Sequence, residues 1–330
     1  MGFLRNDAET LVPEFGSEAF PWRGGDAQTL RHFICRDAPP PPPFETIILD
    51  LDDGDQLMAA YQLPSADTKR RGCVIAVHGL NGCMDASHIL WLTQSMLADG
   101  WAILRVNMRG AGPARPLARR TYNAGAGADL LPFVKWARAR HPKDPVFMMA
   151  HSLGGTAALN MATDYQKESG ALNGLITVGA PLDMVATAAK FHARRNWLYI
   201  RYMLGGLQNI AASVPELDPA LVAMAGKVKS IYEFDDKLTA PLAGYSDANA
   251  YYRGTSVHNR LGELRMPTLV IQASNDPWIP AEPCLAQPLH TNDTAIIVTK
   301  GGGHVGFHDS ALNWHVRATI AWMAARSPAV

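Results

Sequence analysis

The chain has 330 residues, of which 48% are hydrophobic and 18% are charged, so it can bury a large core and is not globally disordered. Lysine plus arginine equals aspartate plus glutamate at 30 each, and this balance gives no support for a nucleic-acid partner. The four cysteines contain no CxxC pair, so the sequence predicts neither a zinc knuckle nor a disulfide framework.

The first predicted unit is residues 1–43, which we expect to be irregular. It ends in five consecutive prolines, residues 39–43, which predict an extended spacer. The segment shows no secretory signal, and the chain has no apolar run approaching the roughly 20 residues that span a bilayer. We therefore expect a cytoplasmic protein without an integral membrane span.

Strand and helix patterns alternate over most of residues 44–330. The stretch 45–63 predicts a hairpin around an Asp-Gly-Asp turn. The further strands are predicted at 72–79, 101–110, 145–150, 174–181, 267–276 and 293–304, and the helices at 86–100, 127–141, 153–167 and 311–326. This alternation predicts an α/β fold with a mostly parallel sheet that helices cover on both sides.

Residues 182–260 interrupt the alternation. Strand patterns disappear there, and amphipathic stretches rich in Tyr, Trp and Arg predict a helical cap inserted into the sheet. The aromatic side chains of 194–206 either pack the cap onto the core, which is the favoured interpretation, or line an acyl pocket. Candidate pocket residues are His151, Trp197 and Trp278. The cap is also where we would expect peripheral membrane contact.

The arginines of residues 109–120 raise a separate question. They form either a solvated loop, which we favour, or a local basic patch.

Ser152 lies between a predicted strand and a predicted helix, in the sequence Ala150-His151-Ser152-Leu153-Gly154. A nucleophile on such a turn is typically found in the pattern G-x-S-x-G. Alanine replaces the first glycine here, so the sequence differs from the pattern by one additional methyl group. The alternative is a serine that caps the helix beginning at Leu153.

An acid and a base for this serine follow in the chain order Ser, Asp, His. Asp276 and His304 each come after a predicted strand, and the carboxyl ends of parallel strands meet at one edge of the sheet. Asp293 and Asp309 are the other nearby acids, and His308 is the competing base. His304 and His308 have metal-ligand spacing, but the intervening Val-Gly-Phe contains no acid and includes a helix-breaking glycine, so we expect no metal site.

Two backbone amides are needed to stabilise the oxyanion of the reaction. The first candidate is the amide of Leu153, directly after the nucleophile, and the second is that of Leu80, with Asn81 as its alternative. We expect His78 to support the Leu80 loop.

Taken together, these segments resemble the α/β hydrolases, and more narrowly their YheT-like branch. The similar stretches are "GGDAQTLRHF", "HGLNG", "GWAILRVNMRGAG", "AHSLGG", "YEFDDKLTAPLAGYSDANAYYR", "PTLVIQASNDPWIP" and "GGGHVGF". The resemblance implies carboxylic-ester chemistry without a metal or cofactor, and it places the triad on Ser152, Asp276 and His304. Asp235 and Asp236 lie in the cap stretch, where we expect a structural role such as helix capping.

The expected function is hydrolysis of short- to medium-chain acyl esters or lipids through an acyl-enzyme. Two alternatives remain. In one the same triad transfers the acyl group to an alcohol, and in the other the fold binds a ligand without turnover.

Overall fold

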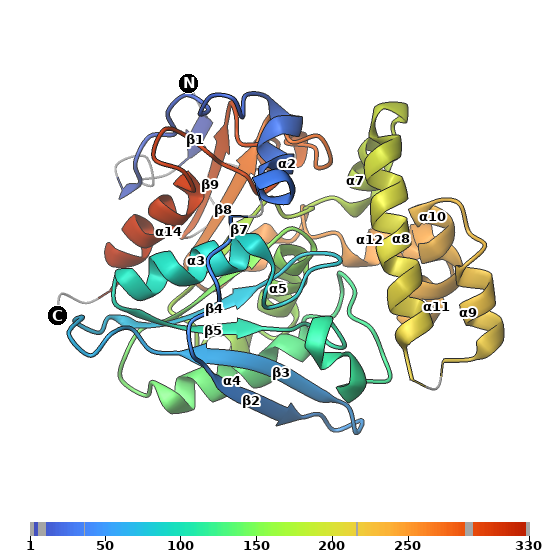
Figure 1. Cartoon of the computed structure of the whole chain (residues 1–330), viewed down its shortest axis with the longest axis horizontal. Helices are drawn as coiled ribbons and strands as arrows, with labels where there is room; N and C mark the ends of the chain where they lie inside the picture. Colours follow the sequence, from blue (N-terminus) through green and yellow to red (C-terminus); the bar gives the residue numbers. More distant parts are fainter. Residues whose placement is uncertain (1–2, 6–10, 36, 216, 288–292, 328–330) are drawn as a thin grey trace.

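The computed structural model describes residues 3–5, 11–35, 37–215, 217–287 and 293–327. Its centre is a nine-stranded sheet of order β1-β9-β8-β7-β6-β4-β5-β3-β2 (Figure 1). The strands are β1 Phe3–Arg5, β2 Glu45–Asp50, β3 Gln56–Gln62, β4 Gly72–Val77, β5 Trp101–Val106, β6 Val146–His151, β7 Gly174–Val178, β8 Thr268–Ala273 and β9 Thr294–Thr299. From β5 to β9 neighbouring strands run parallel, whereas β1, β2 and β3 pair antiparallel. The predicted α/β fold is confirmed.

The central strands are apolar because helices cover both of their faces. Every residue of β4, β5 and β6 is buried. On one face, side chains of α3 and α14 share a core with the sheet, and on the other face side chains of α4 and α5 do so (Figure 1). Outside the cap the helices are α2 Gly25–Cys35, α3 Ser87–Ala98, α4 Leu131–Arg140, α5 Leu153–Asp164, α6 Gln166–Ser169, α13 Glu282–Leu285 and α14 Trp314–Ala324, with 3-10 turns at Gly112–Leu117, Ala128–Leu130 and Leu261–Glu263.

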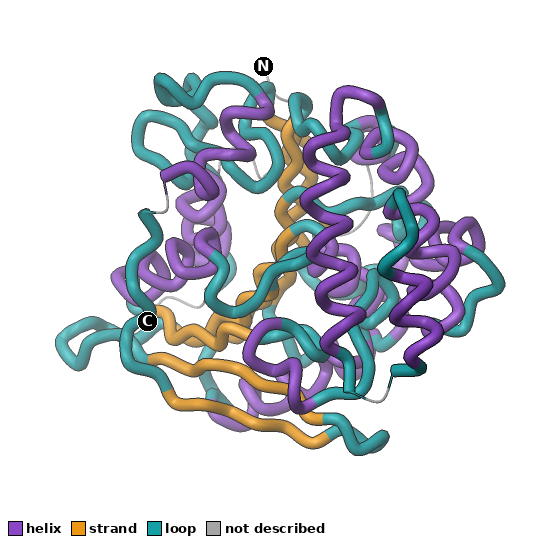
Figure 2. Tube along the Cα trace, turned by 45° about the vertical axis from the view of Figure 1, so that its right-hand side comes forward, coloured by secondary structure: helices purple, strands orange, loops and turns teal. Residues whose placement is uncertain are grey.

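The insertion between β7 and β8 is a helical cap on one side of the molecule (Figures 1 and 2). It contains α7 Met184–Phe191, α8 Trp197–Ser213, α9 Pro219–Ala225, α10 Ile231–Phe234, the π-helix η4 Asp235–Thr239, α11 Ala240–Leu242 and α12 Ala248–Thr255, with a 3-10 turn at Arg194–Asn196. Side chains of α8, α9, α10 and η4 form a small apolar core of their own. The cap therefore has internal packing besides its contacts with the sheet.

The N-terminal segment differs from its prediction. Residues 1–43 were expected to be irregular, but β1 pairs with β9 and residues 25–35 form helix α2. The helix begins at Gly25 with Asp26 in its first turn, a favourable position for a negative charge. The prolines at 39–43 connect α2 to β2 without regular structure, as predicted for a spacer.

The arginine-rich loop is also more ordered than its favoured interpretation. Arg109 is buried and forms ion pairs with Asp53, Asp55 and Asp129 at 2.6–2.9 Å. These contacts join the loop to the tip of the β2–β3 hairpin. Arg109 therefore belongs neither to a solvated loop nor to an uncompensated basic patch. Arg120, in contrast, is exposed.

Within the described part of the chain, every helix is too short or too polar to cross a bilayer.

Candidate active site

Ser152 occupies a strained turn between β6 and α5. Its φ of 51° and ψ of −129° are unusual for a residue with a side chain, and its hydroxyl makes no helix-capping hydrogen bond. The turn requires close packing, because a Cβ on Gly154 would lie 2.2 Å from the carbonyl oxygen of His78. This geometry favours the nucleophile interpretation of Ser152 over the capping one.

The hydroxyl of Ser152 lies 2.9 Å from Nε2 of His304, and Nδ1 of His304 lies 2.8 Å from Oδ2 of Asp276. Oδ1 of Asp276 accepts hydrogen bonds from the amides of Trp278 and Ile279 at 2.8 and 2.9 Å. These bonds fix the carboxylate so that its other oxygen faces the imidazole. The structure thus brings the three predicted residues into one chain of hydrogen bonds from three separate loops.

The competing residues lie elsewhere. Asp293 is exposed, and Asp309 pairs with Arg317 at 2.6 Å. His308 is fully buried, with its ring 4.6 Å from that of His32. None of these three residues forms a hydrogen bond with Ser152 in the described part of the chain.

The N-terminal segment supports the loop that carries His304. The amide of His304 donates to the hydroxyl of Thr29 at 2.8 Å. Glu18 accepts hydrogen bonds from Asn275, on the loop of Asp276, and from the amide of Gly302, on the loop of His304, at 2.9 and 3.0 Å. Sequence patterns do not predict these supporting residues, since they lie more than 250 positions from the residues they support and follow no catalytic spacing. The stretch "GGDAQTLRHF", quoted above for its resemblance, was the one available signal.

The two oxyanion candidates border the same cavity as Ser152. In the described part of the chain, no hydrogen bond uses the amide of Leu80 or of Leu153. His78 supports the Leu80 loop as expected, because its Nδ1 lies 2.8 Å from the oxygen of Gly79 and its Nε2 accepts from the amide of Met108. Burial lowers the pKa of His78 to about 4, which keeps the ring neutral.

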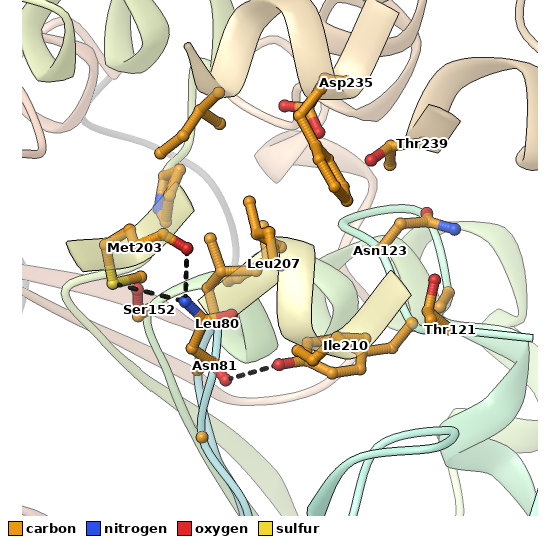
Figure 3. A pocket seen from close by; sticks show the side chains of 18 of the residues that line it. Leu80, Asn81, Thr121, Asn123, Ser152, Met203, Leu207, Ile210, Asp235 and Thr239 are labelled. Carbon is orange, nitrogen blue, oxygen red and sulfur yellow. Dashed lines mark hydrogen bonds between the residues drawn. The ribbon is translucent and has the colours of Figure 1, made fainter. Parts of the chain in front are cut away.

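A cavity of about 970 Å³ opens beside Ser152, between the sheet edge and the cap (Figure 3). Leu80 and the α8 side chains Met203, Leu207 and Ile210 make much of the drawn wall apolar. Asn81 donates to the carbonyl oxygen of Met203 at 2.8 Å, which ties the loop after β4 to the cap. The cavity is large enough for a drug-sized or acyl-chain ligand.

The structure places the three predicted pocket residues in different surroundings. Trp278 lines the cavity and packs its ring 4.4 Å from that of His304. His151 borders the cavity, but its ring is buried against the rings of His88 and His315. The prediction for Trp197 is wrong, since this side chain is 60% exposed and lies outside the cavity. Amphipathic spacing alone did not distinguish the outer face of α8 from its inner face.

Neither of the two cap aspartates is the N-cap of a helix. Ser230 caps α10, and Asp235 starts the π-helix that continues it. Asp247 caps α12, and Asp236 accepts a hydrogen bond from the amide of Ala248 in the first turn of that helix, so Asp236 has a structural role there. Asp235 lines the cavity instead.

A parallel sheet with an inserted cap and a strained serine beyond its central strand define the α/β-hydrolase class. The chain belongs to the family described as serine aminopeptidase, S33, whose model matches residues 68–311. It is 29% identical to the putative esterase YheT of Escherichia coli (strain K12), over 78% of this chain and 77% of that protein. It is 26% identical to phospholipase ABHD3 of Mus musculus, over 92% of this chain and 76% of that protein.

The fold resembles the solved structure of a soluble variant of monoglyceride lipase from Saccharomyces cerevisiae in complex with a substrate analogue. The TM-score is 0.59 at 16% identity, over 88% of this chain and all of that one. The predicted similarity to YheT-like α/β hydrolases is confirmed, and the chain is an enzyme of the serine-hydrolase class.

Proposed function

We propose that the protein hydrolyses carboxylic esters of acyl lipids through an acyl-enzyme on Ser152. The observation that carries the proposal is the pair of hydrogen bonds from Ser152 to His304 and from His304 to Asp276, at 2.9 and 2.8 Å. A serine hydroxyl is a weak nucleophile until a base removes its proton, and the base needs a third group that fixes its orientation.

In the first half of the reaction, Oγ of Ser152 attacks the ester carbonyl while Nε2 of His304 takes its proton. The negative oxygen then accepts hydrogen bonds from the amides of Leu80 and Leu153. His304 returns the proton to the leaving alcohol, and the acyl group stays on the serine. Water repeats the sequence in the second half, which releases the carboxylic acid and restores the hydroxyl.

A lipid substrate is supported by the cavity and by the relatives. The apolar wall formed by Leu80, Met203, Leu207 and Ile210 suits an acyl chain. The relatives named above are a putative esterase and a phospholipase, and the structural neighbour is a monoglyceride lipase.

The surface beside the cavity mouth supports peripheral contact with a lipid phase. Leu198 and Tyr202 lie one turn apart on α8, are 61% and 62% exposed, and Tyr202 contacts Phe33 of α2. Phe33 and Tyr202 also line the cavity, so this apolar surface is continuous with the mouth.

The test is hydrolysis of p-nitrophenyl esters from acetate to palmitate by the wild type and by Ser152→Ala. Ser213→Ala, at an exposed serine on the same cap helix that lines the cavity, is the matched control. We expect turnover to fall by about 10⁴-fold or more in Ser152→Ala and to persist in the control. Equal rates in Ser152→Ala and the wild type would refute the proposal.

Adding a short alcohol to the same assay measures acyl transfer. A new ester product whose yield rises with alcohol concentration would assign the acyltransferase alternative, and free acid alone supports hydrolysis.

A further inference from the structure

One part of the cavity carries polar side chains, unlike the apolar wall beside Ser152. Asp235, Thr239, Asn123 and Thr121 all line the cavity. Figure 3 shows them grouped away from Ser152, with Leu207 and Leu80 in between. A ligand that reaches from Ser152 into this region passes apolar side chains first and hydrogen-bonding groups afterwards.

Asp235 and Thr239 both lie on the π-helix η4. A π-helix closes i to i+5 hydrogen bonds, so residues four apart lie nearly one turn apart and share a face. Asp235 and Thr239 are the first and last residues of this element, and both lie on the cavity. Short π-helical turns occur frequently at functional sites.

The carboxyl group of Asp235 has no cationic partner. In the described part of the chain, no lysine, arginine or histidine nitrogen lies within 4.0 Å of it. The hydroxyl of Tyr252 donates to its Oδ2 at 2.7 Å, and the hydroxyl of Thr239 is a second hydrogen-bonding partner of the carboxyl group. Burial raises the pKa of Asp235 to about 6, and the hydrogen bonds from Tyr252 and Thr239 oppose that rise. A buried carboxylate without a counter-charge is stabilised by hydrogen-bond donors, and because it can accept about four hydrogen bonds, these two donors leave positions for a hydroxyl group of a ligand.

The neighbouring groups also complement a hydroxyl. Asn123 accepts a hydrogen bond from the amide of Gly125 through Oδ1, and no hydrogen bond in the described residues uses its Nδ2. The region therefore offers a carboxylate acceptor and an amide donor, and a hydroxyl group can both donate and accept.

We propose that Asp235, Thr239 and Asn123 form a subsite that binds a hydroxyl group of the substrate, separated by an apolar segment from the ester at Ser152. This inference rests on the proposed esterase function and specifies its substrate class as hydroxylated acyl esters. The hydroxyl has two chemical sources, because either the acyl chain or the alcohol portion can carry it. Hydrogen bonds to a charged acceptor contribute more than neutral ones, so Asp235 is the main determinant.

The experiment compares esters with and without a terminal hydroxyl at matched length. One arm uses p-nitrophenyl ω-hydroxyalkanoates of six to twelve carbons against the plain alkanoates. The other arm uses decanoate monoesters of linear diols against decanoates of the corresponding alcohols. We expect the wild type to favour the hydroxylated ester by about tenfold in kcat/KM in one arm, and that arm identifies which portion enters the subsite.

Three variants identify the residue responsible. Asp235→Leu should bring the ratio of hydroxylated to plain ester close to one while plain esters are still hydrolysed, and Asp235→Asn should retain part of the preference. Asp236→Asn, at the neighbouring residue that bonds the amide of Ala248, is the control and should keep the wild-type ratio. Each ratio is measured within one protein sample, so a variant that folds less well lowers both rates and leaves the ratio interpretable.

A wild-type ratio of one in both arms, or a preference that Asp235→Leu retains, would overturn the subsite. Failure of the esterase proposal would give a different result, because hydrolysis of both the hydroxylated and the plain esters would then be independent of Ser152.

Discussion

The hydroxyl of Thr29 accepts a 2.8 Å hydrogen bond from the backbone amide of His304, across 275 residues of sequence. Thr29 also donates to the carbonyl oxygen of Gly25, so the threonine connects the first turn of α2 to the loop that carries the proposed base. The same helix packs closely on this loop, because a Cβ added to Gly303 would lie 2.4 Å from the carbonyl oxygen of Gly25. Helix α2 thus acts as part of the scaffold of the candidate active site.

Thr29→Val should lower kcat by about tenfold to a hundredfold with little change in KM. Valine has a similar volume but cannot accept the bond from His304, and small displacements of a catalytic group are costly. Steady-state kinetics with a p-nitrophenyl ester measure the effect. Thr46→Val, at an exposed position of the edge strand β2, is the control. Wild-type kinetics in Thr29→Val would show that the bond does not position His304.

Asp276→Asn should reduce kcat by about 10⁴-fold without unfolding the protein. Asparagine keeps an oxygen for the amides of Trp278 and Ile279, but its other group can no longer stabilise a positive imidazole. The measurement is kcat together with a thermal unfolding curve. Asp293→Asn, an exposed acid preceding β9, should behave as the wild type. Retention of more than a tenth of the activity in Asp276→Asn would remove this residue from the triad.

Ala150 and Gly154, each two positions from Ser152, should differ in whether a substitution preserves activity. Gly154→Ala should abolish activity and soluble expression, because the added Cβ meets the carbonyl oxygen of His78 at 2.2 Å. Ala150→Gly completes the usual pattern and should keep full activity, at a stability cost of about 1 kcal/mol from the strand position. Activity assays and urea unfolding of both variants test this contrast. An active, stable Gly154→Ala protein would contradict the packing argument.

Acid should destabilise the fold through a cluster of buried histidines behind β6. Burial lowers the pKa of His151 to about 4 and holds those of His88 and His315 well below 6.5. Their folded-state pKa values lie below those of the unfolded chain, so the unfolded state binds more protons below pH 6.5. Stability should therefore be full above about pH 6.5 and fall as the pH decreases toward 4.

Each of these histidines should contribute a loss of about 1.4 kcal/mol per pH unit in that window. Urea unfolding between pH 8 and 5 measures the slope. Both ring nitrogens of His315 are buried without hydrogen-bond partners, so His315→Leu should be neutral or stabilising and should reduce the slope. His258→Leu, outside the cluster, should leave the slope unchanged. A slope of the wild-type size in His315→Leu would argue against the cluster as its source.

Much of this structure could be predicted from local patterns. Buried strands are apolar runs, and their alternation with helices predicted the parallel sheet and the position of the cap. Ser152, Asp276 and His304 were found because parallel strands align their carboxyl ends, which brings residues after separate strands to one edge.

What the sequence analysis missed depends on contacts between distant segments. Helix α2 was assigned as irregular, although its role becomes evident once Thr29 and Gln28 are seen against the loop of His304 and His308. Trp197 was placed in the pocket because the aromatic pattern of α8 does not show which face is turned outward. Asp235 was interpreted as a cap because a π-helix has no distinctive local sequence pattern.

The proline spacer of residues 39–43 is the covalent link between α2 and the rest of the sheet, and it has no regular structure. A protease cut there would divide the enzyme into a short peptide that carries Glu18 and Thr29 and a long fragment that carries all three residues of the proposed triad. The fragments would have to reassociate for the base loop to be supported, so catalysis would become dependent on peptide concentration. The enzyme is in this sense a natural starting point for split-protein complementation, with ester turnover as the reporter.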